Sequence, residues 1–188
     1  MKTALIVIDM QNGFLNEASP LFIAGAPATV PACAALIGRC REKQIPVFFV
    51  VRRYSADGSD VEHTRYPAWL TGGRPLSPDC AEELSAEIPQ ELGALSSDRV
   101  IVKPRYSAFF DTGLDLVLRR LQIGHLLLAG TTTPNCIRTT CYDAIALDYA
   151  VTVLSDCTSS VTEEIQRSNL RDMANIGARI LRSDELEL

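Results

Sequence analysis

The chain has 188 residues, of which 47% are hydrophobic and 22% charged, and its formal net charge at pH 7 is −5. This length and composition indicate a single globular domain, residues 1–188, with a substantial core. The negative charge argues against nucleic acid or anionic membranes as partners, and no apolar run approaches membrane-spanning length.

The N-terminus and the cysteines indicate a cytoplasmic protein. The apolar N-terminal run is short and is interrupted by Asp9, which argues against a signal peptide. The six cysteines are scattered without a CxxC pair, so we expect free thiols in a reducing compartment.

Short apolar runs alternate with segments of helical spacing along the chain. The predicted strands are Ala4–Ile8, Val47–Val51, Arg99–Val102, Leu126–Ala129, Val151–Leu154 and Ala178–Leu181. The predicted helices are Ala28–Lys43, Gly113–Leu121, a segment that begins at Ile137, and Thr162–Asn175. This order predicts an α/β fold in which helices cover both faces of a parallel sheet.

Residues 54–98 show no sustained period, apart from a short acidic helix predicted near Cys80–Ile88. Loops of this length are usually lids or binding loops, so this variable region is a candidate lid. Its Tyr66 and Trp69 either face a ligand or anchor the loop on the core. A metal on Asp57, Asp60 and His63 is not expected, because such donors in a loop are more often solvated.

Three ionisable residues follow apolar runs at predicted carboxyl ends of strands, where parallel sheets bind their ligands: Asp9, Lys103 and Cys136. Cys136 lies between a strand and a helix, where free N–H groups stabilise a thiolate, although a small residue packed at a helix start is the simpler alternative.

These three residues can together perform nucleophilic catalysis without histidine, of which the chain has only two. A buried Lys103 requires a nearby carboxylate, and Asp9 is the obvious partner. Asp9 can then act as general base for Cys136, while Lys103 holds Asp9 and stabilises the thiolate. N–H groups of the loop before Cys136 can stabilise an oxyanion.

Three segments in this order resemble the isochorismatase-like cysteine hydrolases: ALIVIDMQNGF, KPRYSAFFDT and LLLAGTTTPNCIRTTCYDAIALDYAVTVLSD. This superfamily includes nicotinamidases, N-carbamoylsarcosine amidases, and biuret and ureidoacrylate hydrolases. The resemblance implies a three-layer α/β/α, Rossmann-like fold with a six-stranded parallel sheet. It also implies a catalytic triad of Asp9, Lys103 and Cys136.

The resemblance has further implications for the site and the assembly. It implies a cis peptide between Thr131 and Thr132, an oxyanion hole formed by the N–H groups of Thr132 and Cys136, and a homodimer or homotetramer. Nicotinamidases of this family bind a metal through an Asp and several His. Only His63 lies in the matching region here, so we expect no metal, no other cofactor and no nicotinamidase activity.

The leading hypothesis is a cysteine hydrolase that cleaves a C–N bond of a small amide, carbamoyl or ureido compound through an acyl-enzyme on Cys136. Phe14, Tyr66, Trp69 and Tyr106 are candidate substrate-binding residues, and a pocket with few charges suits a neutral planar substrate. One alternative is an isochorismatase-type vinyl-ether hydrolase, which does not require a Cys nucleophile. Another is a non-catalytic protein of the same fold that binds a small ligand or a partner.

Overall fold

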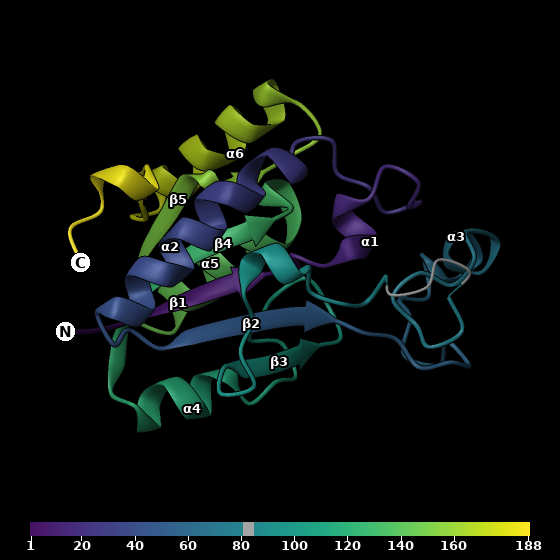
Figure 1. The fold of residues 1–188 in the computed structure, drawn as a ribbon, viewed down its shortest axis with the longest axis horizontal. Coiled ribbons are helices and arrows are strands. Elements are labelled where there is room, and N and C mark those ends of the chain that lie inside the picture. Colours follow the sequence, from purple (N-terminus) through teal and green to yellow (C-terminus); the bar gives the residue numbers. More distant parts are fainter. Residues whose placement is uncertain (81–84) are drawn as a thin grey trace.

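The structure is a computed structural model that describes residues 1–80 and 85–188. Its six parallel strands form one sheet in the order β3-β2-β1-β4-β5-β6 (Figure 1). The strands are β1 (Lys2–Ile8), β2 (Val47–Arg52), β3 (Arg99–Lys103), β4 (Ile123–Thr131), β5 (Ala150–Ser159) and β6 (Arg179–Leu181). This order belongs to doubly wound α/β folds and reverses between β1 and β4.

The α-helices cover both faces of this sheet, so the predicted three-layer α/β/α fold is confirmed. They are α1 (Asn12–Leu15), α2 (Val30–Glu42), α3 (Tyr66–Thr71), α4 (Leu114–Arg120), α5 (Arg138–Ala146) and α6 (Glu163–Asn175). Helix α2 packs on one face, whereas α4, α5 and α6 pack on the other. None of these helices within the described residues is long and apolar enough to cross a membrane.

Strand β1 contributes side chains to the hydrophobic core on both faces of the sheet. Successive side chains of a strand point to opposite faces of the sheet. Accordingly, Leu5 and Val7 pack with α2, while Ile6 and Ile8 pack in the opposite core cluster. Because both faces are covered, the strand is a continuous apolar run rather than an alternating one.

The boundaries of some elements differ from those predicted. Strand β4 extends beyond the predicted Leu126–Ala129, and a π-helical turn, Thr133–Ile137, precedes α5. The helix predicted near Cys80–Ile88 includes residues 81–84, which lie outside the described residues, and residues 85–87 form turns and a bend. Helix α3 was not predicted, because six residues are too short to show helical periodicity.

The carboxyl ends of the strands meet at one edge of the sheet, as in other parallel sheets. Helices α1 and α3 lie beyond the ends of β1 and β2 at this edge (Figure 1). The loop region after β2 therefore lies at the same edge of the sheet as Asp9, which follows β1, and Lys103, the last residue of β3.

Candidate active site

The fold brings together the three ionisable side chains that the sequence singled out at the strand ends. Lys103 Nζ lies 2.8 Å from Asp9 Oδ2 and 3.5 Å from Cys136 Sγ. All three residues are buried, with exposed fractions of 0% for Lys103, 1% for Asp9 and 7% for Cys136. Lys103 therefore bridges a carboxylate and a thiol inside the protein.

Strand pairing places the two charged members of this cluster. Asp9 follows β1 with a φ of +52°, in the left-handed region that Asp tolerates better than most residues. Its N–H donates to Val50 O of β2 over 2.8 Å. Lys103 ends β3 in register with Arg52 of β2, and its Nζ also donates to Arg105 O over 3.0 Å.

A glycine allows β4 to pass close to the end of β1. Gly130 pairs with Ile8, and a Cβ on Gly130 would lie only 2.0 Å from Ile8 O. Its φ of +118° is also a conformation that other residues rarely adopt. After Gly130, the chain continues through a cis peptide between Thr131 and Thr132, as the family resemblance implies, to the turn that carries Cys136.

The surroundings of Cys136 favour its neutral thiol over the thiolate. Burial raises the pKa of this thiol to about 12, with a further contribution from the Asp9 carboxylate, while Lys103 and Arg52 act to lower it. The sequence predicted a stabilised thiolate at this strand-to-helix junction. The buried environment and the adjacent carboxylate outweigh that effect, so forming the thiolate requires a proton acceptor.

Asp9 is suited to accept this proton. Its Oδ2 lies 2.8 Å from Lys103 Nζ, which balances its charge, and its carboxylate contributes to the raised pKa of the Cys136 thiol through a side-chain hydrogen bond. A carboxylate in contact with the thiol is placed to accept its proton.

A fourth ionic group, Arg52, lies at the end of β2 and is 2% exposed. Its Nη1 donates to Glu62 Oε1 over 2.6 Å and to Tyr54 Oη over 2.9 Å. Burial acts to lower the pKa of Arg52, but Asp9 and the weaker contributions of Tyr54, Cys136 and Glu62 together raise it by more, so the guanidinium remains charged.

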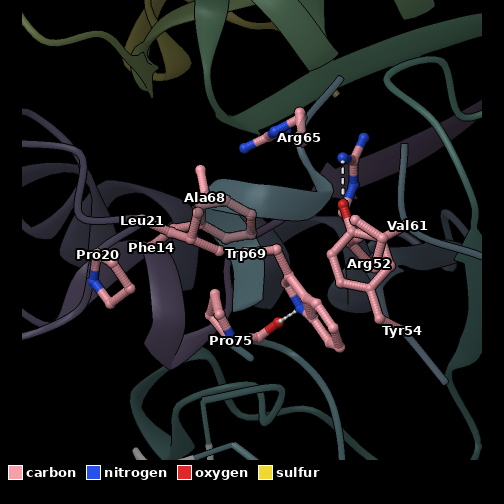
Figure 2. A pocket seen from close by; sticks show the side chains of 10 residues that line it. All are labelled: Phe14, Pro20, Leu21, Arg52, Tyr54, Val61, Arg65, Ala68, Trp69 and Pro75. Carbon is pink, nitrogen blue, oxygen red and sulfur yellow. Dashed lines mark hydrogen bonds between the residues drawn. The ribbon is translucent and has the colours of Figure 1, made fainter. Parts of the chain in front are cut away.

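Two adjoining cavities open beside these residues. The first has a volume of about 210 Å³ and is lined by Asp9, Phe14, Pro20, Leu21, Phe22, Ile23, Arg52, Arg65, Tyr106, Thr132, Asn135 and Cys136. The second has a volume of about 260 Å³ and is lined by Phe14, Pro20, Leu21, Arg52, Tyr54, Val61, Arg65, Ala68, Trp69 and Pro75 (Figure 2). Five residues line both cavities, so the two form one cleft that begins at Cys136.

The predicted substrate-binding residues differ in where they lie. Phe14 lines both cavities, Tyr106 lines the cavity at Cys136, and Trp69 lines the second cavity. Tyr66 lines neither cavity and packs against Trp69, with 5.7 Å between ring centroids. For Tyr66, the structure therefore favours the alternative that it anchors the loop.

The cleft carries positive charge, because Arg52 and Arg65 line both cavities. Arg52 directly follows the predicted strand Val47–Val51, so the reasoning that identified Asp9 at the end of β1 also identifies Arg52. Arg65 lies in the irregular loop region, where no sequence pattern marks it.

The described side chains around Asp57 and Asp60 do not fit a metal site. Among residues 1–80 and 85–188, no group of three or more His, Cys, Asp or Glu side chains could hold an ion. Asp57 Oδ1 accepts hydrogen bonds from the N–H and hydroxyl of Ser59, and the Asp60 carboxylate accepts from those of Ser55. The carboxylates of Asp57 and Asp60 thus accept hydrogen bonds from residues of their own loop.

Comparison with known proteins identifies relatives along nearly the whole chain. The isochorismatase domain model matches residues 3–185. A probable inactive nicotinamidase from Arabidopsis thaliana is 40% identical over 94% of this chain and 90% of its own length. A ureidoacrylate amidohydrolase from Serratia proteamaculans is 33% identical over 84% of this chain and 69% of its own length.

The fold of this chain is also similar to that of proteins with solved structures. An isochorismatase family protein from Desulfovibrio vulgaris superposes with a TM-score of 0.91 and is 41% identical in sequence. The match covers 97% of this chain and 95% of that protein.

Proposed function

Since the chain belongs to the isochorismatase family, we propose that it is a cysteine hydrolase that cleaves a C–N bond of a small amide, carbamoyl or ureido compound. The observation that carries this proposal is the buried contact of Lys103 with both Asp9 and Cys136 at the base of a cavity. The name of the Serratia relative, an amidohydrolase, supports this bond class.

In the first half-reaction, Cys136 Sγ attacks the carbonyl carbon of the substrate while Asp9 takes the thiol proton. The resulting tetrahedral intermediate carries a negative oxygen. When it collapses, the C–N bond breaks and Asp9 returns the proton to the leaving nitrogen. Ammonia or an amine departs, and a thioester on Cys136 remains.

In the second half-reaction, Asp9 takes a proton from a water molecule, whose oxygen attacks the thioester. Collapse of the second tetrahedral intermediate releases the acid and returns the proton to Cys136. Lys103 stays charged throughout and stabilises each negative charge that appears on Asp9 or Sγ.

We assign the oxyanion hole to the backbone N–H groups of Thr132 and Cys136. Both residues line the cavity beside Asp9, and both are largely buried. Donors in a site that excludes water stabilise a developing oxyanion more strongly than solvent does.

The test is ammonia release from a panel of small amides and ureides, with intact-mass detection of an acyl adduct. We expect Cys136→Ser and Asp9→Asn to lower kcat/KM by about 1,000-fold or more, as removal of a nucleophile or its base does. Cys141→Ser is the matched control, because Cys141 is a buried thiol of α5 that lines neither cavity. Equal activity of Cys136→Ser and Cys141→Ser would exclude the thioester mechanism.

A second candidate is a protein of this fold that binds a small ligand without hydrolysing it. The name of the Arabidopsis relative, a probable inactive nicotinamidase, favours this candidate. Saturable binding without ammonia release or an acyl adduct would support it. Hydrolysis of a vinyl ether that survives Cys136→Ala would instead indicate the isochorismatase-type reaction.

The homodimer or homotetramer and the cytoplasmic location remain predictions from the sequence. Size-exclusion chromatography with light scattering measures the first, and fractionation of the source cells measures the second.

A further inference from the structure

Ser159, the last residue of β5, contacts the segment before Cys136 on both sides of Thr132. Its hydroxyl donates to Thr131 Oγ1 over 3.0 Å. Its carbonyl oxygen accepts a hydrogen bond from the hydroxyl of Thr133 over 2.9 Å. Thr131 and Ser159 also pair in register where β4 and β5 run side by side. One residue of β5 therefore holds both neighbours of Thr132.

Thr132 itself is held through its side chain and its carbonyl. Its hydroxyl shares a hydrogen bond of 3.1 Å with the hydroxyl of Thr131. Its carbonyl oxygen accepts from the N–H groups of Asn135 and Ile137 over 3.1 and 3.3 Å. Ser159 and Thr131 are both buried, so a hydrogen bond lost between them is not replaced by one to bulk water.

The hydroxyl groups continue the contact between β4 and β5 beyond the end of the strands. Strand β4 ends at Thr131, and the last register pair of the two strands is Thr131 with Ser159. The next residues, Thr132 and Thr133, lie outside this ladder and begin the turn that carries Cys136. Here the hydroxyls of Thr131 and Thr133 supply the contacts with β5 that ladder hydrogen bonds supply further back.

This arrangement sets the direction of the Thr132 N–H, which we assigned to the oxyanion hole. That N–H belongs to the peptide unit between Thr131 and Thr132, and peptide units are planar and rigid. Hydrogen bonds to the side chains on both sides of this unit therefore restrict its rotation. A donor to an oxyanion has to lie about 2.7–3.1 Å from the position that the negative oxygen takes, so a small rotation weakens it.

We propose that Ser159 is a positioning residue, which aims the Thr132 N–H at the oxygen of the tetrahedral intermediate through its contacts with Thr131 and Thr133. This inference rests on the proposed hydrolase function, because it concerns the oxyanion hole of that reaction. Ser159 lines neither cavity of the cleft, so it acts through these residues and does not contact the substrate. Loss of its hydroxyl slows only those reactions of Cys136 that pass through an oxyanion.

The test compares two reactions of Cys136 that differ in this respect. With p-nitrophenyl acetate, Sγ attacks the carbonyl carbon while Asp9 takes the thiol proton, and a tetrahedral oxyanion forms. Its C–O bond then breaks, p-nitrophenolate leaves and an acetyl thioester remains. With iodoacetamide, Sγ displaces iodide from a saturated carbon in one step, and no oxyanion forms. Intact-mass spectrometry with peptide mapping measures both rates at Cys136.

Two substitutions remove the hydroxyl link, and a third retains it. We expect Ser159→Ala and Thr131→Val each to slow acylation about 10- to 100-fold, as a displaced oxyanion donor does, and to leave alkylation unchanged. Thr131→Ser keeps the hydroxyl and should acylate like the wild type. Thr152→Val is the matched control on β5, because it removes a buried hydroxyl that bonds His125 Nε2 over 2.9 Å; it should change neither rate.

Three results would overturn the inference. The first is an equal loss of acylation and alkylation in Ser159→Ala, which would indicate a general displacement of Cys136. The second is unchanged acylation in Ser159→Ala and Thr131→Val, or no acylation of Cys136 in the wild type. The third is a double variant Ser159→Ala/Thr131→Val that acylates more slowly than Thr131→Val alone, because substitutions that break the same link should not add.

Hydrolysis of the amide and ureide panel separates this inference from the proposed function. Ammonia release that depends on Cys136, with kcat unchanged in Ser159→Ala, would overturn the inference and leave the hydrolase in place. Acylation by p-nitrophenyl acetate that depends on Ser159, without hydrolysis of any amide or ureide, would support the positioning role and overturn the hydrolase. A lower kcat in Ser159→Ala, with KM less affected and alkylation unchanged, would support both.

Discussion

Replacing Lys103 with Met tests whether the buried ion pair holds the site together. At the observed 2.8 Å, an effective dielectric constant of ~20 gives a Coulomb attraction of about 6 kcal/mol. Desolvation offsets part of this attraction, and breaking a buried pair typically costs about 3–5 kcal/mol. Arg52 also interacts with Asp9 and remains in the variant, so we expect a loss of about 3 kcal/mol, at the lower end of that range.

Urea unfolding at neutral pH measures this loss, which corresponds to a fall in Tm of about 6–12 °C for a chain of this size. Arg119→Met is the control, because Arg119 forms an exposed ion pair with Asp115 on α4, and such pairs contribute about 0–1 kcal/mol. The double variant Asp9→Asn/Lys103→Met should be more stable than Lys103→Met alone, since it leaves no unpaired carboxylate. If Lys103→Met loses no more stability than Arg119→Met, the reasoning is refuted.

Two further predictions concern stability. Gly130→Ala should lower the free energy of unfolding by about 3 kcal/mol or more, because the added Cβ would meet Ile8 O. Gly38→Ala in α2 is the control: its Cβ would meet nothing within 4 Å, and it should raise the free energy of unfolding by about 0.5–1 kcal/mol. Thermal unfolding measures both variants, and equal effects would contradict the prediction. Burial raises the pKa of the Cys136 and Cys141 thiols from 9.0 to about 12, so their contribution to stability is complete below about pH 9 and falls as the pH rises toward 12. Urea midpoints that stay constant from about pH 8 to pH 11 would contradict the second prediction.

The fold and the positions of Asp9 and Lys103 could be predicted because one simple rule applies to all of them. Buried parallel strands are apolar runs, and a polar residue directly after such a run lies at the edge of the sheet where ligands bind. The rule identifies Asp9 at the end of β1 and Lys103 at the end of β3 without knowledge of strand order. It applies equally to Arg52 at the end of β2.

Other parts of the site depend on contacts that local sequence does not encode. Glu62 pairs with Arg52 from an irregular loop, and Gln11, in the loop after β1, holds the Arg52 backbone at the end of β2 through two hydrogen bonds. The raised pKa of Cys136 could not be predicted either, because it depends on the depth of burial and the position of Asp9. Short helices such as α3 lack a period long enough to detect.

The positions of the site residues along the chain also determine when the site can form during synthesis. Asp9, Arg52 and Lys103 all belong to the first half of the sheet, whereas Cys136 follows β4 in the second half. The ribosome therefore completes the charged groups before it makes the nucleophile, and neither half alone contains both. A chain divided between α4 and β4 would regain its reactive thiol site only when the two fragments reassociate, which makes that site a reporter of their assembly.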